Sequence, residues 1–166
     1  QEWSEVLALL RFLKKLEVEA IFVKGNHDNY ISQILRLQSL KVVDAFEEKG
    51  FLFVHGHQLL EEYTDFKNWK PFHTLVLGHV HPAVTLRDDV GYLHKYKCAL
   101  KGKYKGKNLV VLPSLSPLAA GFDVTRSEAT HEYVSPILKK CKIGDFVPFV
   151  IDAEAGVREF PQIKHL

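Results

Sequence analysis

Three short histidine-containing segments carry most of the chemistry that this sequence could perform. They are Gly25-Asn26-His27-Asp28, His55-Gly56-His57 and Gly78-His79-Val80-His81. Each follows directly on a run of apolar, mostly β-branched residues, which is typical of a buried strand. If the three strands are neighbours in one sheet, the loops that follow them meet at one edge. The sequence therefore predicts a cluster of imidazoles and a carboxamide of the kind that holds metal ions for phosphate-ester chemistry.

The residue types in the second and third segments suit a set of metal ligands. His79 and His81 are two residues apart, so both can point inward if the chain stays extended there. Gly78 lets the backbone come close to metal ions without a clash from a Cβ atom. His55 supplies a third imidazole. His57 either binds a metal or supports the ligands through a hydrogen bond.

The first segment adds groups of a different kind. Asn26 offers a carboxamide oxygen to a metal and an amide N–H to phosphate. His27 can protonate a leaving alkoxide, and Asp28 beside it would orient the ring and raise its pKa. Alone, a Gly-Asn-His triplet is often a turn with a capping asparagine, and a single His-x-His pair is often part of a surface strand. The three segments in this order favour a site, whereas surface or structural roles are expected for the other histidines: His73, His94, His131 and His165.

These residues resemble the second half of the signature of the calcineurin-like metallophosphoesterases. That signature ends in G-N-H-[DE], a lone histidine, and G-H-x-H, which correspond to Gly25–Asp28, His55 and Gly78–His81. The stretches GHVHPAVTLRDDVGYLHKYKCALKG and LVVLPSLSPLAAGFDV are similar to the archaeal branch related to DNA-ligase-associated (PdeM-type) phosphoesterases.

The resemblance implies a four-layer α/β/β/α sandwich and a site with two divalent metal ions. Manganese is the expected metal, with Fe, Zn, Ni or Co as alternatives. Asn26, His55 and His79 would bind one ion and His81 the other, while His27 would act as general acid with Asp28 as its partner. Gly25, Gly78 and His57 would support these ligands.

The family signature also contains D-x-H and G-D-x-x-D blocks, and neither precedes residue 25. In the family these blocks lie on the first two strands and supply the bridging carboxylate. We therefore expect a fold that lacks its first strands, binds one metal ion at most, and is inactive alone. The blocks lie outside these 166 residues, arrive on a separate chain, or have been lost from a degraded relative.

The spacing of apolar residues predicts helices alternating with short strands, and hence an α/β fold. Helices are expected over 1–16, 29–38 and 59–70, and strands over 20–24, 41–45, 51–54 and 74–77, with a turn at 47–50. Residues 92–100 alternate with a period of two, as in a half-exposed strand. A turn at 101–107 and strands over 109–112, 146–152 and 157–160 complete an antiparallel second half. Residues 1–166 are expected to form a single domain.

Composition sets limits on the partners. The net charge of +2 is too small to imply a nucleic-acid or membrane partner by itself. Cys98 and Cys141 are expected to be free thiols in a cytoplasmic, reducing compartment, and no apolar run is long enough for a membrane helix. A homodimer is left open. A cluster of lysines could contact the phosphates of a nucleic acid, but a solvated hairpin is the simpler interpretation. The cluster consists of Lys95, Lys97, Lys101, Lys103, Lys105 and Lys107.

The sequence thus predicts a metal-dependent phosphoesterase or phosphodiesterase. A phosphate ester would be its substrate and a metal-activated hydroxide its nucleophile. The alternative is a protein-binding scaffold that kept the fold and lost turnover. The intact Asn26-His27-Asp28 argues against that alternative, because a scaffold does not need an acid there.

Overall fold

The structure is a computed structural model. It describes residues 2–16, 18–28, 34–35, 40–116, 118–126, 135–152, 154 and 156–166, with backbone alone over 2–6. The predicted helix over 29–38 lies outside these residues except for Ile34 and Leu35, of which Leu35 is buried. His131 and Pro117 also lie outside them.

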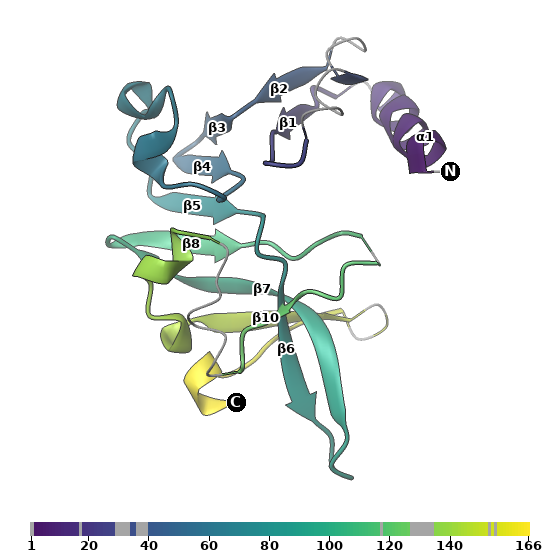
Figure 1. The fold of residues 1–166 in the computed structure, drawn as a ribbon, viewed down its shortest axis with the longest axis vertical. Coiled ribbons are helices and arrows are strands. Elements are labelled where there is room, and N and C mark those ends of the chain that lie inside the picture. Colours follow the sequence, from purple (N-terminus) through teal and green to yellow (C-terminus); the bar gives the residue numbers. More distant parts are fainter. Residues whose placement is uncertain are drawn as a thin grey trace.

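The described chain is a mixed α/β fold with one large sheet, one small sheet and few helices (Figure 1). Helix α1 (Glu2–Lys15) ends with Lys14 and Lys15, as the helix dipole favours. It buries Leu10, whereas Phe12 and Leu16 remain about half exposed. In the part of the chain that the structure describes, no helix has the length and apolar character needed to cross a bilayer.

The small sheet pairs β1 (Ile21–Val23) with β2 (Lys41–Val43) in parallel. The predicted strand over 41–45 is therefore split at Asp44, because β3 (Ala45–Glu48) pairs instead with β4 (Phe51–Val54). The turn between β3 and β4 consists of Lys49 and Gly50 alone, both with positive φ. A two-residue turn of this kind fits the twist of an antiparallel hairpin, so the predicted turn at 47–50 was too long.

The large sheet has the strand order β11-β10-β7-β8-β5-β4-β3. Off this path, β6 pairs with β7, and β9 pairs with β6. Strands β4, β5 (Thr74–Leu77) and β8 (Lys107–Val111) are parallel neighbours. Antiparallel pairing joins β8 to β7 (Leu93–Tyr104), β7 to β10 (Val147–Asp152), and β10 to β11 (Gly156–Glu159). The hydrophobic core lies against this sheet and includes Leu52, Leu75, Leu77, Leu100 and Leu109, all fully buried.

Strand β7 confirms the predicted alternation only near the end of the range 92–100, where Cys98 and Leu100 are buried and Ala99 between them is half-buried. Residues 92–95 are all exposed. The strand runs further than expected, and the turn before β8 consists only of Lys105 and Gly106. Strand β6 (Pro82–Arg87) was not predicted. It pairs with the first half of β7 and, in parallel, with β9 (Phe122–Asp123).

The predicted helix over 59–70 is wrong. The segment forms two short 3₁₀ helices, Leu60–Glu62 and Phe66–Asn68. Its apolar residues recur every third position, which matches the three residues per turn of a 3₁₀ helix better than the 3.6 of an α-helix. These residues pack towards the core: Leu60, Tyr63, Phe66 and Trp69.

Both cysteines are free thiols, as predicted. Burial raises the pKa of Cys98 to about 12 and that of Cys141 to about 11. Because the thiolate is the reactive form, both should react with a thiol-specific disulfide reagent at pH 8 much more slowly in the folded protein than in urea. Cys141→Ser leaves only Cys98, which should then show almost no reaction until unfolding. Fast labelling of folded Cys141→Ser would contradict the burial of Cys98.

Candidate metal centre

The second and third histidine segments leave adjacent parallel strands at the same edge of the large sheet. Val54 ends β4 and is followed by His55, and Leu77 ends β5 and is followed by Gly78. The Gly78 N–H donates a hydrogen bond to the carbonyl oxygen of His55 at 3.1 Å, which ties the two loops together. Parallel pairing of β4 and β5 thus places the two imidazole-bearing loops side by side.

The first segment reaches this edge from the small sheet. Lys24 donates its backbone N–H to Val43 at 2.8 Å, which continues the pairing of β1 with β2. A tight turn follows, in which the Gly25 N–H donates to Asp28 Oδ2 at 2.7 Å and the Asp28 N–H donates to the Gly25 carbonyl at 3.2 Å. Asp28 therefore fixes the turn that presents Asn26. Its expected pairing with the exposed His27 stays a prediction.

Four of the predicted site residues come together: Asn26, His55, His57 and His79. Asn26 Oδ1 lies 3.1 Å from His55 Nε2, and His79 Nδ1 lies 3.1 Å from the same nitrogen. The ring centroids of His55 and His79 are 4.8 Å apart. The His57 ring lies 5.4 Å from that of His55 and 6.1 Å from that of His79. We call these four residues the histidine cluster.

Burial and crowding favour the neutral form of two rings in the cluster, those of His55 and His79. Burial, followed by the neighbouring imidazoles of His79 and His57, lowers the pKa of His55 to about 4. Burial also lowers the pKa of His79, followed by the effects of His57, His81 and His27. His81 and His27 thus lie near enough to act on the His79 ring electrostatically. Neutral imidazoles at pH 7 have the nitrogen lone pairs that a metal ion requires.

The loop after β5 is not extended, contrary to the prediction. His79 and His81 both have positive φ, 62° and 51°, and Val80 between them is buried. The Val80 N–H donates to the Gly78 carbonyl at 2.7 Å, so the chain turns sharply there. The two histidines are therefore not presented by a strand-like alternation of faces. A left-handed backbone is uncommon for residues other than glycine and gathers at functional sites.

Because φ is positive at His81, glycine should stabilise the fold more than alanine at this position, the reverse of their usual order in helices. His81→Gly should have a free energy of unfolding about 1 kcal/mol higher than His81→Ala, because a Cβ atom is disfavoured at this φ. At the exposed helical position Ala8, alanine should instead be more stable than Ala8→Gly by about 1 kcal/mol. Urea unfolding of the variants gives the comparison. Equal stability of the two His81 variants would contradict the left-handed conformation.

The packing of the protein around His55 requires glycine at Gly25 but not at Gly78. A Cβ atom at Gly25 would lie 2.8 Å from His55 Cε1 and 2.9 Å from Asp28 Oδ2, both closer than real contacts allow. A Cβ atom at Gly78 would lie 3.7 Å from His55 Nδ1, which is an ordinary contact. The structure thus leaves room for a methyl group between Gly78 and His55, and the expected close approach of Gly78 to a metal ion stays a prediction.

The loop between His55 and His57 is held from two sides. Gly56 has φ of 98°, donates its N–H to the Tyr63 hydroxyl at 3.3 Å, and accepts a hydrogen bond from Ser135 Oγ at 2.7 Å. Ser135 is fully buried and lies 79 positions further along the chain. Sequence reasoning did not identify Tyr63 or Ser135, because neither adjoins a histidine motif.

The donor set of the cluster fits one metal ion. Ligand atoms about 2.1 Å from an ion and at right angles to each other lie about 3 Å apart, close to the two separations of 3.1 Å found here. His57 Nδ1 and His79 Nε2 are buried and have no hydrogen-bond partner among the described residues. In the same part of the chain, no three His, Cys, Asp or Glu side chains are arranged to hold a metal. The converging donors are two imidazoles and the Asn26 carboxamide.

A polar cavity of about 420 Å³ adjoins the cluster. Asn26 and His57 form part of its wall, and Lys24 brings a positive charge to it. Lys24 directly precedes the first histidine segment, and this position in the sequence could have identified it. The lining residues are Lys24, Gly25, Asn26, Asp44, His57, Gln58, Glu62, Tyr63 and Thr64.

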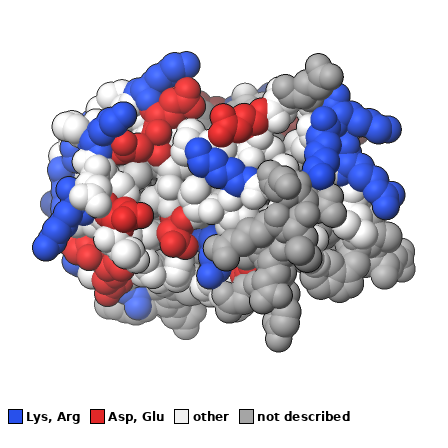
Figure 2. Space-filling view, turned by 90° about the horizontal axis from the view of Figure 1, so that it is seen from above, with Lys and Arg blue, Asp and Glu red and all other residues white. Residues whose placement is uncertain are grey.

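Most lysines of the predicted basic cluster have structural partners. Lys95 Nζ donates to the Gly121 carbonyl at 2.6 Å, and Lys97 Nζ donates to the carbonyls of Ser114 and Ser116. Lys105 forms an ion pair with Glu61 at 2.6 Å. On the face shown in Figure 2, acidic and basic side chains are interspersed, and basic side chains gather at the end where α1 lies. Lys95 and Lys97 thus hold the loop that contains Ser114, Ser116 and Gly121 against the hairpin. Nucleic-acid contact stays a prediction.

The remaining described histidines lie apart from the cluster. His73 contacts Thr74 Oγ1 at 2.9 Å, and His165 belongs to the short 3₁₀ helix Ile163–His165. His94 pairs with Asp88 at 2.9 Å.

Comparison with solved structures identifies a fold of the same kind. The crystal structure of the nuclease MPE from Pseudomonas putida is similar, with a TM-score of 0.56 and 19% sequence identity. The match covers 93% of this chain and 60% of that one, so the chain spans less than two thirds of the nuclease. The mixed α/β architecture with its large central sheet is consistent with the predicted metallophosphoesterase-like sandwich. No family model matches the sequence, and no curated protein matches it.

Proposed function

We propose that the chain hydrolyses phosphate esters at a divalent-metal centre built on the histidine cluster. The approach of Asn26 Oδ1 and His79 Nδ1 to His55 Nε2, at 3.1 Å each, carries the proposal. The nuclease-like fold supports it, because a phosphodiester is the bond that a nuclease cleaves. We therefore propose a phosphodiester as the substrate.

Asn26, His55 and His79 would hold one ion, and His81 would contribute to a second. A bound divalent ion, with Mn²⁺ as our first candidate, polarises a phosphoryl oxygen and lowers the pKa of a bound water. His27 is exposed beside the cluster and would protonate the leaving oxygen. Asp28 keeps the turn in place through its hydrogen bond to Gly25. His57, whose Nδ1 has no hydrogen-bond partner among the described residues, would either bind a metal or support the other ligands.

The proposed two-ion centre would be completed by carboxylates of the kind that the D-x-H and G-D-x-x-D blocks carry. The sequence given holds neither D-x-H nor G-D-x-x-D, and a second ion requires oxygen donors that bridge it to the first. Among the described residues, no three His, Cys, Asp or Glu side chains are arranged to hold a metal, although Asp44 and Glu62 line the cavity beside the cluster.

The test is hydrolysis of bis(p-nitrophenyl) phosphate with Mn²⁺, measured for residues 1–166 alone and for the same chain supplied with a segment that carries both blocks. Activity should require that segment, disappear with EDTA and return with Mn²⁺. His79→Ala should abolish it. Equal activity with and without the segment would contradict the two-ion centre, and full activity of His79→Ala would contradict the placement of the centre.

A further inference from the structure

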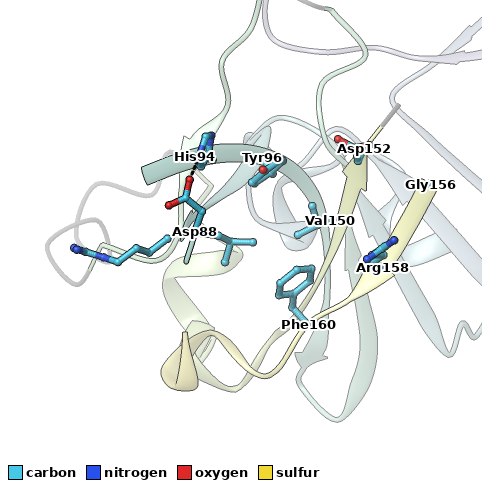
Figure 3. Close-up of a pocket in the computed structure, with 10 residues that line it drawn as sticks. Asp88, His94, Tyr96, Val150, Asp152, Gly156, Arg158 and Phe160 are labelled. Atoms are coloured by element: carbon cyan, nitrogen blue, oxygen red, sulfur yellow. Dashed lines mark hydrogen bonds and ion pairs between the residues drawn. The ribbon is translucent and has the colours of Figure 1, made fainter. Parts of the chain in front are cut away.

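A second cavity of about 370 Å³ lies far from the histidine cluster. It is formed between the β6–β7 hairpin and the β10–β11 hairpin (Figure 3). Strand β6 leads from His81 to Arg87, and six extended residues span about 20 Å. The cavity is therefore a separate site. Its volume falls in the range of about 300–1,000 Å³ that small-molecule sites occupy.

The floor of this cavity is apolar and partly aromatic. Val150 is 5% exposed, while Tyr96 and Phe160 are half-buried and lie on either side of it in Figure 3. The His94 ring is 6.3 Å from that of Tyr96 and tilted by 37°. Flat, partly exposed rings of this kind offer stacking surface to a planar ligand.

Two arginines and two aspartates line the cavity, and both carboxylates already accept hydrogen bonds, which leaves the arginines available to an anion. Asp152 accepts one from the backbone N–H of Glu154 at 2.9 Å. Asp88 is occupied by hydrogen bonds from His94 Nε2 and from the backbone N–H groups of Val90 and Tyr92, at 2.9, 3.1 and 2.8 Å. The described residues provide no hydrogen bond or ion pair for the guanidinium groups of Arg87 and Arg158, both of which line the cavity. Arginine binds phosphate in a planar, two-pronged arrangement.

We infer that this cavity binds a single nucleotide. The base would stack on the aromatic floor beside Tyr96 and Phe160, and the phosphate would pair with Arg158. The nucleotide could be a free nucleoside monophosphate or one unpaired nucleotide of a nucleic acid strand, and the chemistry of recognition is the same. The inference does not depend on the proposed hydrolysis, because neither the cluster nor a metal ion takes part.

Binding is measured in EDTA, so that the metal centre plays no role. AMP, adenosine and inorganic phosphate are titrated by calorimetry, and a fluorescein-labelled single-stranded oligodeoxyadenylate is titrated by fluorescence anisotropy. AMP should bind more tightly than adenosine or phosphate alone. Arg158→Gln should weaken binding of AMP by about tenfold or more, as expected for a lost charge-assisted contact. Arg11→Gln, the same change at an exposed position on α1, should have no effect.

Tyr96→Leu, which removes the ring and keeps an apolar side chain, should also weaken binding. If this variant does not fold by circular dichroism, Arg158→Gln decides alone. An oligonucleotide that binds more tightly than AMP identifies a strand as the ligand, and equal affinities identify the free nucleotide. The inference is overturned if neither probe binds at millimolar concentration, or if binding is the same in Arg158→Gln as in the unmodified protein.

Discussion

Gly25→Ala should weaken metal binding at the histidine cluster by about 10- to 100-fold, the size of effect seen when groups that support metal ligands are changed. The new methyl group would lie 2.8 Å from His55 Cε1 and 2.9 Å from Asp28 Oδ2. Either the His55 ring moves away from Asn26 and His79, or the turn that presents Asn26 opens. Both movements separate the proposed ligand atoms. Titration with Co²⁺, followed by its absorption spectrum, measures the affinity.

Gly78→Ala is the matched control for this prediction. It adds the same methyl group one loop away, where the nearest atom of His55 would be 3.7 Å distant. Its metal affinity should stay within a factor of a few of the unmodified protein. Thermal unfolding of both variants separates a local effect from a general loss of structure. If the two variants bind Co²⁺ equally well, the close packing of Gly25 against His55 is not what assembles the cluster.

His27→Ala should lower turnover of the complete, metal-loaded enzyme by about 10²–10⁴-fold, the contribution that a general acid makes. The side chain is exposed, so folding should be unchanged, and metal affinity should also be retained because His27 is not a proposed ligand. The measurement is the rate constant for hydrolysis of a diester with a poor leaving group, since such a leaving group depends most on protonation.

His165→Ala is the control for His27→Ala. It removes an exposed histidine near the C-terminal end of the chain and should leave turnover unchanged. The loss in His27→Ala should shrink with p-nitrophenolate as leaving group, because that group departs without a proton. An unchanged rate in His27→Ala with both substrates would favour the alternative of a scaffold that kept the fold without catalysis.

The elements next to the motifs could be predicted well from the sequence. The strands 51–54 and 74–77 have the predicted bounds, because short apolar runs between polar loops leave little choice of conformation. These strands determine where His55 and Gly78 leave the sheet, and this explains why the meeting of the loops could be anticipated.

The errors have physical causes that single-sequence patterns do not capture. Residues 59–70 have apolar side chains at every third position, and this was taken for an α-helical pattern, although it fits 3₁₀ turns. Strand β6 begins with Pro82 and depends on pairing with β7, so its stability comes from tertiary contacts. The left-handed conformations of His79 and His81 have no sequence signal comparable to a glycine. The cavity of Figure 3 joins two hairpins that are separated along the chain by β8 and β9.

The hydrogen bond from Ser135 to Gly56 has a consequence for the order of events during synthesis. A ribosome releases His55, His57 and His79 long before Ser135, since the bonded pair is separated by 79 positions. Until Ser135 has been synthesised, the turn between His55 and His57 lacks one of the two hydrogen bonds that hold it. A nascent chain should therefore capture metal poorly and reach full affinity only after its C-terminal third has folded. Premature termination before residue 135 would leave a polypeptide that carries every histidine motif and still binds metal weakly.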